Sequence, residues 1–415
     1  MRIQACAAAE FLNGCFGYVF CFETPASALG IGNTFSVFTF ILAKGGARHM
    51  NYKELIEKSA ASIAAQDDGF FKNTFRRDEL VNSAIDTVRK FDSDMKSLKE
   101  DAGVLFGSVS AAGGDDNGAK VAALFDKWRD NPPSTAAIIC AAAQHFDIPA
   151  DNRQLKAAVM AGLAAEVDND NPYHSNHHFR EVTASIARLC NTHNELAASG
   201  KAGAVLLEAD DLGKCLLAAA GHDLMHDGKT NSLTGPESHQ QYRLENKAIS
   251  AIEPFMQLAG MNVRDQEDVR VMIRITDISA PQGGKSPHSL LKTAAQGNAA
   301  ALPAELADMA RSPALLAMCT LMSDADLGPS TGTDFTYSRK MTTLLSQENP
   351  ALANSNKTLA GFLQFVVGGE LTSDAGKATS GKALSSIMQE AQKPDGNAPA
   401  PAVPAQKQSA KAAAP

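Results

Sequence analysis

The histidines of this 415-residue chain are concentrated in one stretch, and their spacing is the first sign of chemistry. Six of the ten lie between residues 174 and 226. His174 and His178 are four apart in NPYHSNHHFREV, and His222 and His226 are four apart in LLAAAGHDLMHDGKTN, where Asp223 follows the first of the pair. Residues at this spacing share one face of a helix. The second pair follows the apolar run LLAAA, and polar groups that are buried persist when they are paired or bound to a metal. We therefore predict a metal site.

Each motif has a plainer interpretation when taken alone. A single HxxxH pair is more often a solvated helix face or a core histidine with a satisfied hydrogen bond. His177, His193 and His239 have no spacing argument and are assigned no role of their own. The segment HDLMH is similar to the zinc-protease pattern HExxH, but Asp223 is a methylene shorter than the glutamate that acts there as general base, so this interpretation is disfavoured.

A further carboxylate comes from ALLAMCTLMSDADLGPS, an apolar helix that ends in Asp324 and Asp326. Either residue could be the ligand. The helix dipole disfavours a carboxylate at this end, which favours a cation partner. Imidazoles and carboxylates together suit zinc, manganese, iron or magnesium. Two such ions roughly 3.5–4 Å apart can share a hydroxide nucleophile and polarise a phosphoryl group.

The composition predicts an all-α fold that positions these residues. Alanine is abundant, β-branched runs are short and aromatic residues make up only 6%, and alanine is the best helix former. We expect a helical N-terminal region over 50–130, with a boundary at the two prolines of DNPPS. A compact multi-helix catalytic domain follows over 131–375. The Pro/Ala-rich residues 376–415 are expected to be largely disordered.

Residues 1–49 differ from the rest. Their apolar runs are interrupted or too short to span a bilayer, so we interpret them as a weak membrane-associating segment, a signal peptide without a clean cleavage site, or an upstream extension. The seven cysteines lack paired CxxC spacing, which favours free thiols and a cytoplasmic location. The net charge of -8 without a basic run argues against binding to nucleic acid.

Six motifs in order resemble the catalytic domain of class I 3′,5′-cyclic nucleotide phosphodiesterases, a branch of the HD-type metal hydrolases. NPYHSNHHFREV resembles NPYHNxxHAxDV, and GHDLMHDGKTN resembles HDxxHxGxxN. YRLENKAI is similar to the segment that contains LEN, and MIRITDIS to the one that ends in ATDMS. DADLGPS resembles ADLSNP, and AGFLQFVV resembles VGFIDYIV. Together they cover roughly residues 135–370, and the resemblance implies a compact bundle of helices of the HD type.

The resemblance also implies roles for individual residues. Those that match ligands of the tighter metal, usually zinc, are His178, His222, Asp223 and Asp326. Asp223 would bridge to a second ion, usually magnesium or manganese. The catalytic group would comprise His174 as general acid, Glu245 as a residue near the second metal that could orient His174, and His226. The residues implied around the substrate are Tyr173, Asn231, Leu359 and Phe362. Those implied to hold ligands in place are His226, Asn231, Thr276 and Asp277.

Four positions depart from the family pattern. Leu359 stands where the family has the glutamine that binds the purine, and Pro329 stands at another base contact. Ser323 and Glu181 replace a histidine and an aspartate. Because base specificity depends on paired hydrogen bonds, the departures bear on the substrate more than on the reaction.

The function expected from the resemblance is hydrolysis of a small-molecule phosphodiester, a 3′,5′-cyclic nucleotide converted to its 5′-monophosphate. A metal-bridging hydroxide would attack phosphorus while His174 protonates the leaving oxygen. The alternatives are an HD-type hydrolase acting on another nucleotide or phosphoester, a non-catalytic sensor that keeps the metal, and a di-iron oxygenase.

Overall fold

The computed structural model describes residues 3–11, 15–22, 52–71, 74–107, 117–167, 169–201, 203–232, 239–281, 284–298 and 302–395. The chain divides into two units, Met1–Asn51 and Tyr52–Pro415. Within the residues just given, no helix is both long enough and apolar enough to cross a membrane.

The first unit contains an antiparallel pair of strands, β1 (Ile3–Phe11) and β2 (Cys15–Phe22). The register pairs Ile3 with Phe22 and Phe11 with Cys15, with an irregularity between Cys6 and Ala9. The sequence predicts no secondary structure for residues 1–49, and the structure adds these two strands to it. The aromatic and β-branched residues of CFGYVFCF favour a strand, a preference that the overall composition hides. Most of the remainder of the predicted 1–49 segment lies outside the described residues.

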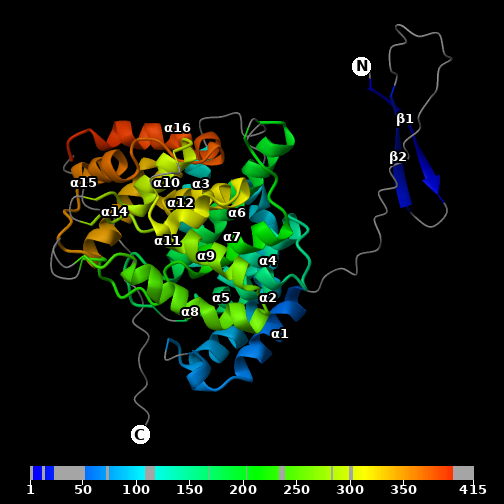
Figure 1. The fold of residues 1–415 in the computed structure, drawn as a ribbon, viewed down its shortest axis with the longest axis horizontal. Coiled ribbons are helices and arrows are strands. Elements are labelled where there is room, and N and C mark those ends of the chain that lie inside the picture. The colour runs from blue at the N-terminus through cyan, green and yellow to red at the C-terminus, as the bar shows by residue number, and fades with distance from the viewer. Residues whose placement is uncertain are drawn as a thin grey trace. The chain divides into compact units, whose positions relative to one another are not determined.

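The second unit confirms the prediction of an all-α fold (Figure 1). Its longer helices are α1 (Tyr52–Ala64), α2 (Arg77–Leu105), α3 (Asn117–Asp130), α4 (Thr135–His145), α5 (Arg153–Ala164), α6 (Asn176–Ala198), α7 (Ala209–Gly221), α8 (Arg243–Ala259), α9 (Val263–Arg274), α10 (Pro287–Ala295), α12 (Pro313–Asp326), α14 (Phe335–Glu348) and α16 (Asp374–Ala391). The short elements are the helices α11 (Ala304–Ala307), α13 (Gly328–Thr331) and α15 (Asn356–Gly361), the 3₁₀ turns η1 (Asp68–Phe71) and η4 (Asp308–Ala310), and the π-helix η5 (Phe362–Val366).

Small residues let the central helices pack closely. Most side chains of α4, α5 and α7 are buried, and many are alanines. A Cβ atom at Gly162 would lie 2.8 Å from Ile139 Cδ1, and one at Gly213 would lie 2.7 Å from Gln154 Cβ. The abundance of alanine therefore reflects close helix approach as well as helix propensity.

Polar residues define where several helices start. The side chains of Asn152, Ser312 and Asp334 accept hydrogen bonds from the backbone N–H groups three residues further on, at the first turns of α5, α12 and α14. These caps fix the start of each helix. They thereby help to position the last residues of α12 and α14, which are Asp326 and Glu348.

Two predicted boundaries differ from the structure. Ser134 caps α4 as expected after DNPPS, with Oγ accepting from Ala137 N, but residues 52–130 belong to the same compact unit as the helices that follow. The predicted disordered tail starts too early, because α16 continues to Ala391 and buries Leu384 and Ile387. The Pro/Ala-rich composition that suggested disorder begins only after this helix; residues 396–415 lie outside the described part.

Candidate functional site

Two imidazoles and two carboxylates meet where helix ends converge. His178 lies in the first turn of α6, His222 and Asp223 directly follow α7, and Asp326 is the last residue of α12. His222 Nε2 lies 3.0 Å from Asp223 Oδ2 and 3.2 Å from Asp326 Oδ1. His178 Nε2 lies 3.3 Å and 3.5 Å from the same two oxygens. The structure thus brings together the four residues predicted as ligands of one metal.

These distances fit a shared cation. Ligand atoms held about 2.0–2.2 Å from one ion lie roughly 3.0–3.5 Å from one another. His222 Nδ1 donates to Ala219 O at 2.9 Å, which leaves the lone pair of Nε2 facing the carboxylates. Nε2 of His178 and of His222 are both buried, and neither has a hydrogen-bond partner among the described residues. A buried lone pair that faces two carboxylates is unfavourable unless a proton or a metal ion lies between them.

The electrostatics favour positive charge at this point. Burial alone would lower the pKa of His178, but Asp223 and Asp326 raise that pKa to about 9. The C-terminal ends of α7 and α12 also meet here, and each contributes partial negative charge from its last carbonyl groups. The donor set of two imidazoles and two carboxylates therefore suits a divalent ion such as zinc.

His174 is held beside this cluster by Glu348, the last residue of α14. Glu348 Oε1 lies 2.5 Å from His174 Nδ1, and its Oε2 accepts from the backbone N–H groups of Tyr173 at 3.0 Å and His174 at 3.1 Å. His174 Nε2 lies 3.9 Å from Asp223 Oδ2 and so faces the cluster. The carboxylate thus fixes both the ring and the backbone of the residue predicted as general acid.

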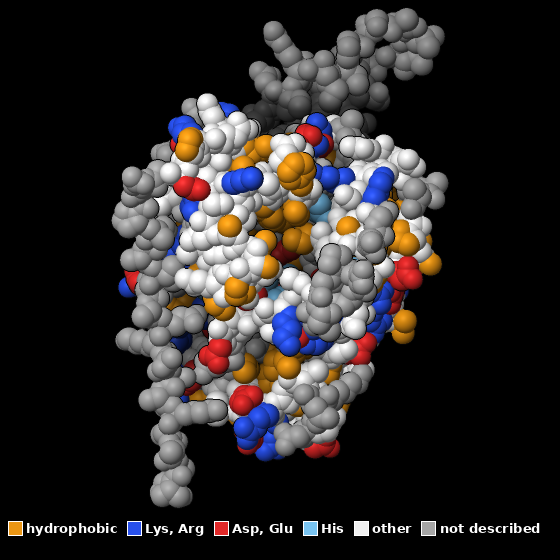
Figure 2. All heavy atoms as spheres, turned by 90° about the vertical axis from the view of Figure 1, so that its left-hand side faces the viewer, with side chains coloured by type: hydrophobic (Ala, Val, Ile, Leu, Met, Phe, Trp, Pro, Cys, Tyr) orange, Lys and Arg blue, Asp and Glu red, His pale blue; other side chains and the backbone are white. Residues whose placement is uncertain are grey.

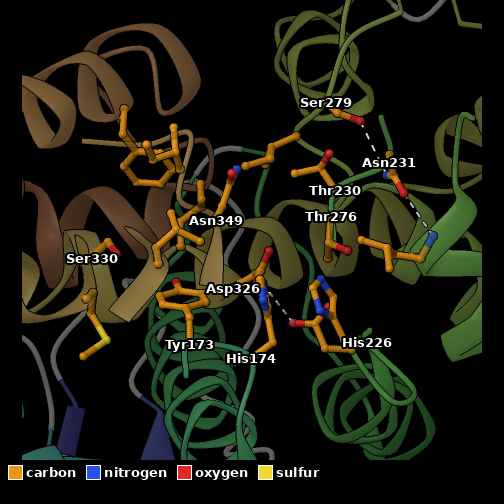
Figure 3. Close-up of a pocket in the computed structure, with 18 of the residues that line it drawn as sticks. Tyr173, His174, His226, Thr230, Asn231, Thr276, Ser279, Asp326, Ser330 and Asn349 are labelled. Atoms are coloured by element: carbon orange, nitrogen blue, oxygen red, sulfur yellow. Dashed lines mark hydrogen bonds and ion pairs between the residues drawn. The ribbon is translucent and has the colours of Figure 1, made fainter. Parts of the chain in front are cut away.

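His226 supports the ring of His174 from the other side (Figure 3). The two rings stack with centroids 3.7 Å apart and planes at 24°. His226 Nδ1 accepts a hydrogen bond from Gly228 N at 3.2 Å. Burial, together with His174, lowers the pKa of His226 to about 4, so it is neutral at pH 7. His174, His226 and Glu348 lie close together. They are poorly arranged to bind an ion, because the two rings are stacked and Nδ1 of His226 already accepts a hydrogen bond.

Glu245 does not occupy the position that would orient His174, which corrects one suggestion from the sequence. Its Oε2 accepts from Asn231 Nδ2 at 3.1 Å. Burial, and then Asp277 and Asp223, raise the pKa of Glu245 to about 8. Asp277 is held in turn by Tyr242 N and by the backbone and side chain of Ser279. Negative groups therefore gather on this side of the site.

A cavity of about 370 Å³ opens over the cluster. Figure 2 shows the hollow in one face of the molecule, with acidic and histidine side chains inside it and hydrophobic side chains around it. The predicted site residues that line it are Tyr173, His174, Asp223, His226, Asn231, Glu245, Thr276, Asp277, Asp326, Leu359 and Phe362. His178 and His222 lie beneath, so every predicted site residue is in or next to this cavity.

Other candidates from the sequence have structural partners elsewhere. Asp324, the alternative ligand, accepts from Thr372 N at 2.9 Å and from Ser373 N and Oγ at 2.7 and 2.6 Å, which ties the start of α16 to α12. His177 bonds with Glu181 at 2.9 Å, and His193 with Val205 O at 2.7 Å. Asp326 is therefore the carboxylate of α12 that joins the cluster.

Sequence reasoning missed Glu348. It lies at the C-terminal end of an amphipathic helix, where the dipole disfavours a carboxylate. A carboxylate at the C-terminal end of a helix was also what pointed to Asp326, and Glu348 likewise has a positively charged or hydrogen-donating neighbour, His174. Glu348 lies in no recognisable motif, and its place at a helix end does not identify the residue that it contacts.

Comparisons with known proteins found no matching family model and no matching curated protein. Among solved structures, the chain is similar to the phosphodiesterase domain of a rhodopsin phosphodiesterase from Salpingoeca rosetta. One structure of it is 19% identical, with a TM-score of 0.42, covering 63% of this chain and 87% of that one. A second is 17% identical, with a TM-score of 0.40, covering 65% and 89%. By name both are phosphodiesterase domains.

Proposed function

We propose that this protein is a metal-dependent phosphodiester hydrolase that opens a 3′,5′-cyclic nucleotide to the 5′-monophosphate. The observation that carries the proposal is a four-ligand cluster at the bottom of a cavity with an oriented imidazole beside it. The nitrogens of His178 and His222 face the oxygens of Asp223 and Asp326 at 3.0–3.5 Å, and His174 Nε2 lies 3.9 Å from Asp223.

His178, His222, Asp223 and Asp326 would hold a zinc ion. The carboxylates Asp223, Glu245 and Asp277 line the same cavity. Burial, and then repulsion by Asp277 and Asp223, raise the pKa of Glu245, so a magnesium or manganese ion would be bound among them. Bound metal supplies Lewis-acid activation of a phosphoryl group and of water.

The protein's own groups would handle the proton. Glu348 accepts from Nδ1 of His174, so the proton for the leaving oxygen resides on Nε2, the nitrogen that faces the cluster. His226, neutral and stacked on this ring, limits its rotation without adding a charge. Such a proton donor distinguishes a hydrolase from a sensor that keeps its metal for structure.

The test is hydrolysis of cyclic AMP and cyclic GMP by the purified protein with zinc plus magnesium or manganese, beside a chelated sample. We expect metal-dependent release of the 5′-monophosphate, lost in Asp223→Ala together with the metal. Asp227→Ala is the matched control, because Asp227 pairs with Arg243 and Lys247 instead of the cluster. Bound metal without turnover of either nucleotide would reject a cyclic nucleotide as substrate.

A second candidate is hydrolysis of another phosphoester at the same metals. The observation that favours it is Leu359, which lines the cavity with an apolar side chain and is 1% exposed. A panel of phosphomonoesters and dinucleotides assayed under the same conditions separates it from the first.

A further inference from the structure

Asn349 stands out among the polar side chains that line the cavity because the protein uses all of its polar groups except one. It is the residue immediately after α14, and its backbone N–H donates to Leu345 O at 2.7 Å. Its backbone carbonyl accepts from Leu352 N at 3.0 Å, and its side-chain Oδ1 accepts from Ala351 N at 3.2 Å. The backbone and the side-chain oxygen are thus fixed by the turn that follows the helix.

The remaining group, Nδ2, carries two N–H donors. No described residue accepts a hydrogen bond from it, whereas Asn349 lines the cavity. Because Oδ1 is committed to Ala351 N, the carboxamide cannot exchange its two ends without losing that bond. Figure 3 shows Asn349 near the middle of the cavity, between the end marked by Tyr173 and His174 and the end marked by Ser279.

The other polar groups on this wall are already engaged. Thr358 Oγ1 lies 3.0 Å from Ser355 Oγ, while Leu345, Leu352, Leu359 and Phe362 present apolar surface. An oriented N–H donor within an apolar wall favours one kind of ligand. When a ligand covers the donor, the donor loses its hydrogen bond to water, and only a ligand atom that accepts a hydrogen bond replaces it.

Resting on the proposed function, we propose that Asn349 Nδ2 donates a hydrogen bond to the organic part of the substrate. The substrate then combines a phosphodiester at the metal cluster with a flat, largely apolar group that carries an acceptor, such as a carbonyl oxygen or a ring nitrogen. Every common nucleobase has such an acceptor, so a single donor binds a base without separating adenine from guanine.

The position of Asn349 also links recognition with catalysis. It directly follows Glu348, whose carboxylate holds His174. The end of α14 therefore places the group that orients the proton donor and the group that contacts the substrate on adjacent residues. Pro350 comes next, and the backbone of Asn349 is outside the helical region, at φ -118° and ψ 90°, in line with the preference of a residue before proline.

The experiment compares two phosphodiesters of nearly equal shape, methyl 4-acetylphenyl phosphate and methyl 4-isopropylphenyl phosphate, of which only the first carries a carbonyl acceptor. The measured quantity is the ratio of their kcat/KM values, so that differences in leaving group cancel between enzyme variants. Asn349→Leu removes the donor at similar volume, and Asn349→Asp keeps an oxygen for Ala351 N while replacing the donor. Thr358→Val is the matched control on the same wall.

We expect the ratio to fall about tenfold in both Asn349 variants, the value of one ordinary hydrogen bond, and to stay at the wild-type value in Thr358→Val. Calorimetric binding of methyl (4-acetylbenzyl)phosphonate and methyl (4-isopropylbenzyl)phosphonate, in which a methylene replaces the leaving oxygen, should show the same change in ratio without turnover. Hydrolysis of both esters with an unchanged ratio in the Asn349 variants would overturn the role of Asn349 and leave the proposed function standing. Failure to hydrolyse any phosphodiester with metal bound would overturn the proposed function itself.

Discussion

Glu348 holds His174 at two points through one carboxylate, which also bonds to the backbone of the preceding residue, Tyr173. Oε1 lies 2.5 Å from the ring Nδ1, and Oε2 accepts from the backbone N–H of His174 at 3.1 Å and of Tyr173 at 3.0 Å. Burial would raise the pKa of Glu348, but its bonds with His174 lower that pKa to about 2. The carboxylate is therefore ionised at neutral pH and keeps a proton on Nδ1, so the proton that His174 would give to a leaving oxygen resides on Nε2.

The first prediction concerns this pair. Glu348→Gln should lower kcat by about 10- to 100-fold, because a misplaced general acid loses much of a contribution that is typically 10²–10⁴. Metal content should not change, since Glu348 is not among the four ligands. Gln347→Ala, an exposed neighbour on α14, is the control. Steady-state kinetics and metal analysis on the same preparations decide the matter, and a loss of metal in Glu348→Gln would show that the residue serves the ligand cluster.

The second prediction separates the two aspartates of α12. Asp326→Asn should lose the metal while the fold is retained, because Oδ1 of Asp326 faces both ligand histidines. Asp324→Asn should keep the metal and lower the free energy of unfolding by about 1–3 kcal/mol, since one oxygen that accepts from Ser373 becomes a donor.

Metal stoichiometry and urea unfolding of the two variants, side by side, provide the measurement. The opposite pattern, with metal lost from Asp324→Asn and kept in Asp326→Asn, would reverse the assignment of the ligand.

The third prediction concerns pH and Glu245. Its pKa of about 8 in the folded chain is above the ordinary 4.5. Below pH 4.5 the carboxyl of Glu245 is protonated in both the folded and the unfolded protein, and it does not lower the free energy of unfolding. As pH rises from 4.5 through 8 the unfolded chain ionises first, so the folded state loses stability. Chelated Glu245→Gln should therefore become more stable than the wild type by an amount that grows to roughly 3 kcal/mol near pH 7.

Unfolding by urea at pH 4.5, 6 and 8 measures this difference. Glu57→Gln, an exposed site on α1, is the control and should give a difference close to zero at each pH. A pH-independent difference in unfolding free energy for Glu245→Gln would mean that folding does not raise the pKa of Glu245 in the chelated protein.

The sequence was sufficient for the helical class, and the order of its motifs was sufficient for the four residues of the cluster, which the structure brings together. The helical interpretation of the histidine spacing was wrong, because His174 precedes α6, and His222 and His226 follow the end of α7. The histidines therefore meet at helix ends and not along one helix face. Glu348 and Asn349 could not be found in this way. Their position in the cavity depends on the packing of α14 and on the turn that follows it, and no local sequence pattern specifies either.

Local preference also explains one error of extent. The strands β1 and β2 lie in the segment 1–49, for which no secondary structure was predicted, and their aromatic and β-branched residues favour strands. The helix α16 was missed because its own composition is mixed with that of the Pro/Ala-rich residues that follow. Its buried residues Leu384, Ile387 and Ala391 recur at helical spacing, a signal that a shorter window detects.

The fourth prediction tests whether α16 is part of the folded unit. Leu384 and Ile387 are 2% and 1% exposed and pack in a cluster with Leu327, Leu359 and Leu363. Truncation of a buried isoleucine leaves a cavity, so Ile387→Ala should lower the free energy of unfolding by about 2–4 kcal/mol. The exposed neighbour Ser386→Ala should change it by less than about 0.5 kcal/mol. Because Leu359 lines the cavity that we propose binds the substrate, and belongs to the same cluster, Ile387→Ala should also raise KM while metal content stays constant. Equal stability of the two variants would mean that α16 does not pack on this cluster, and that the wall of the cavity is held by other contacts.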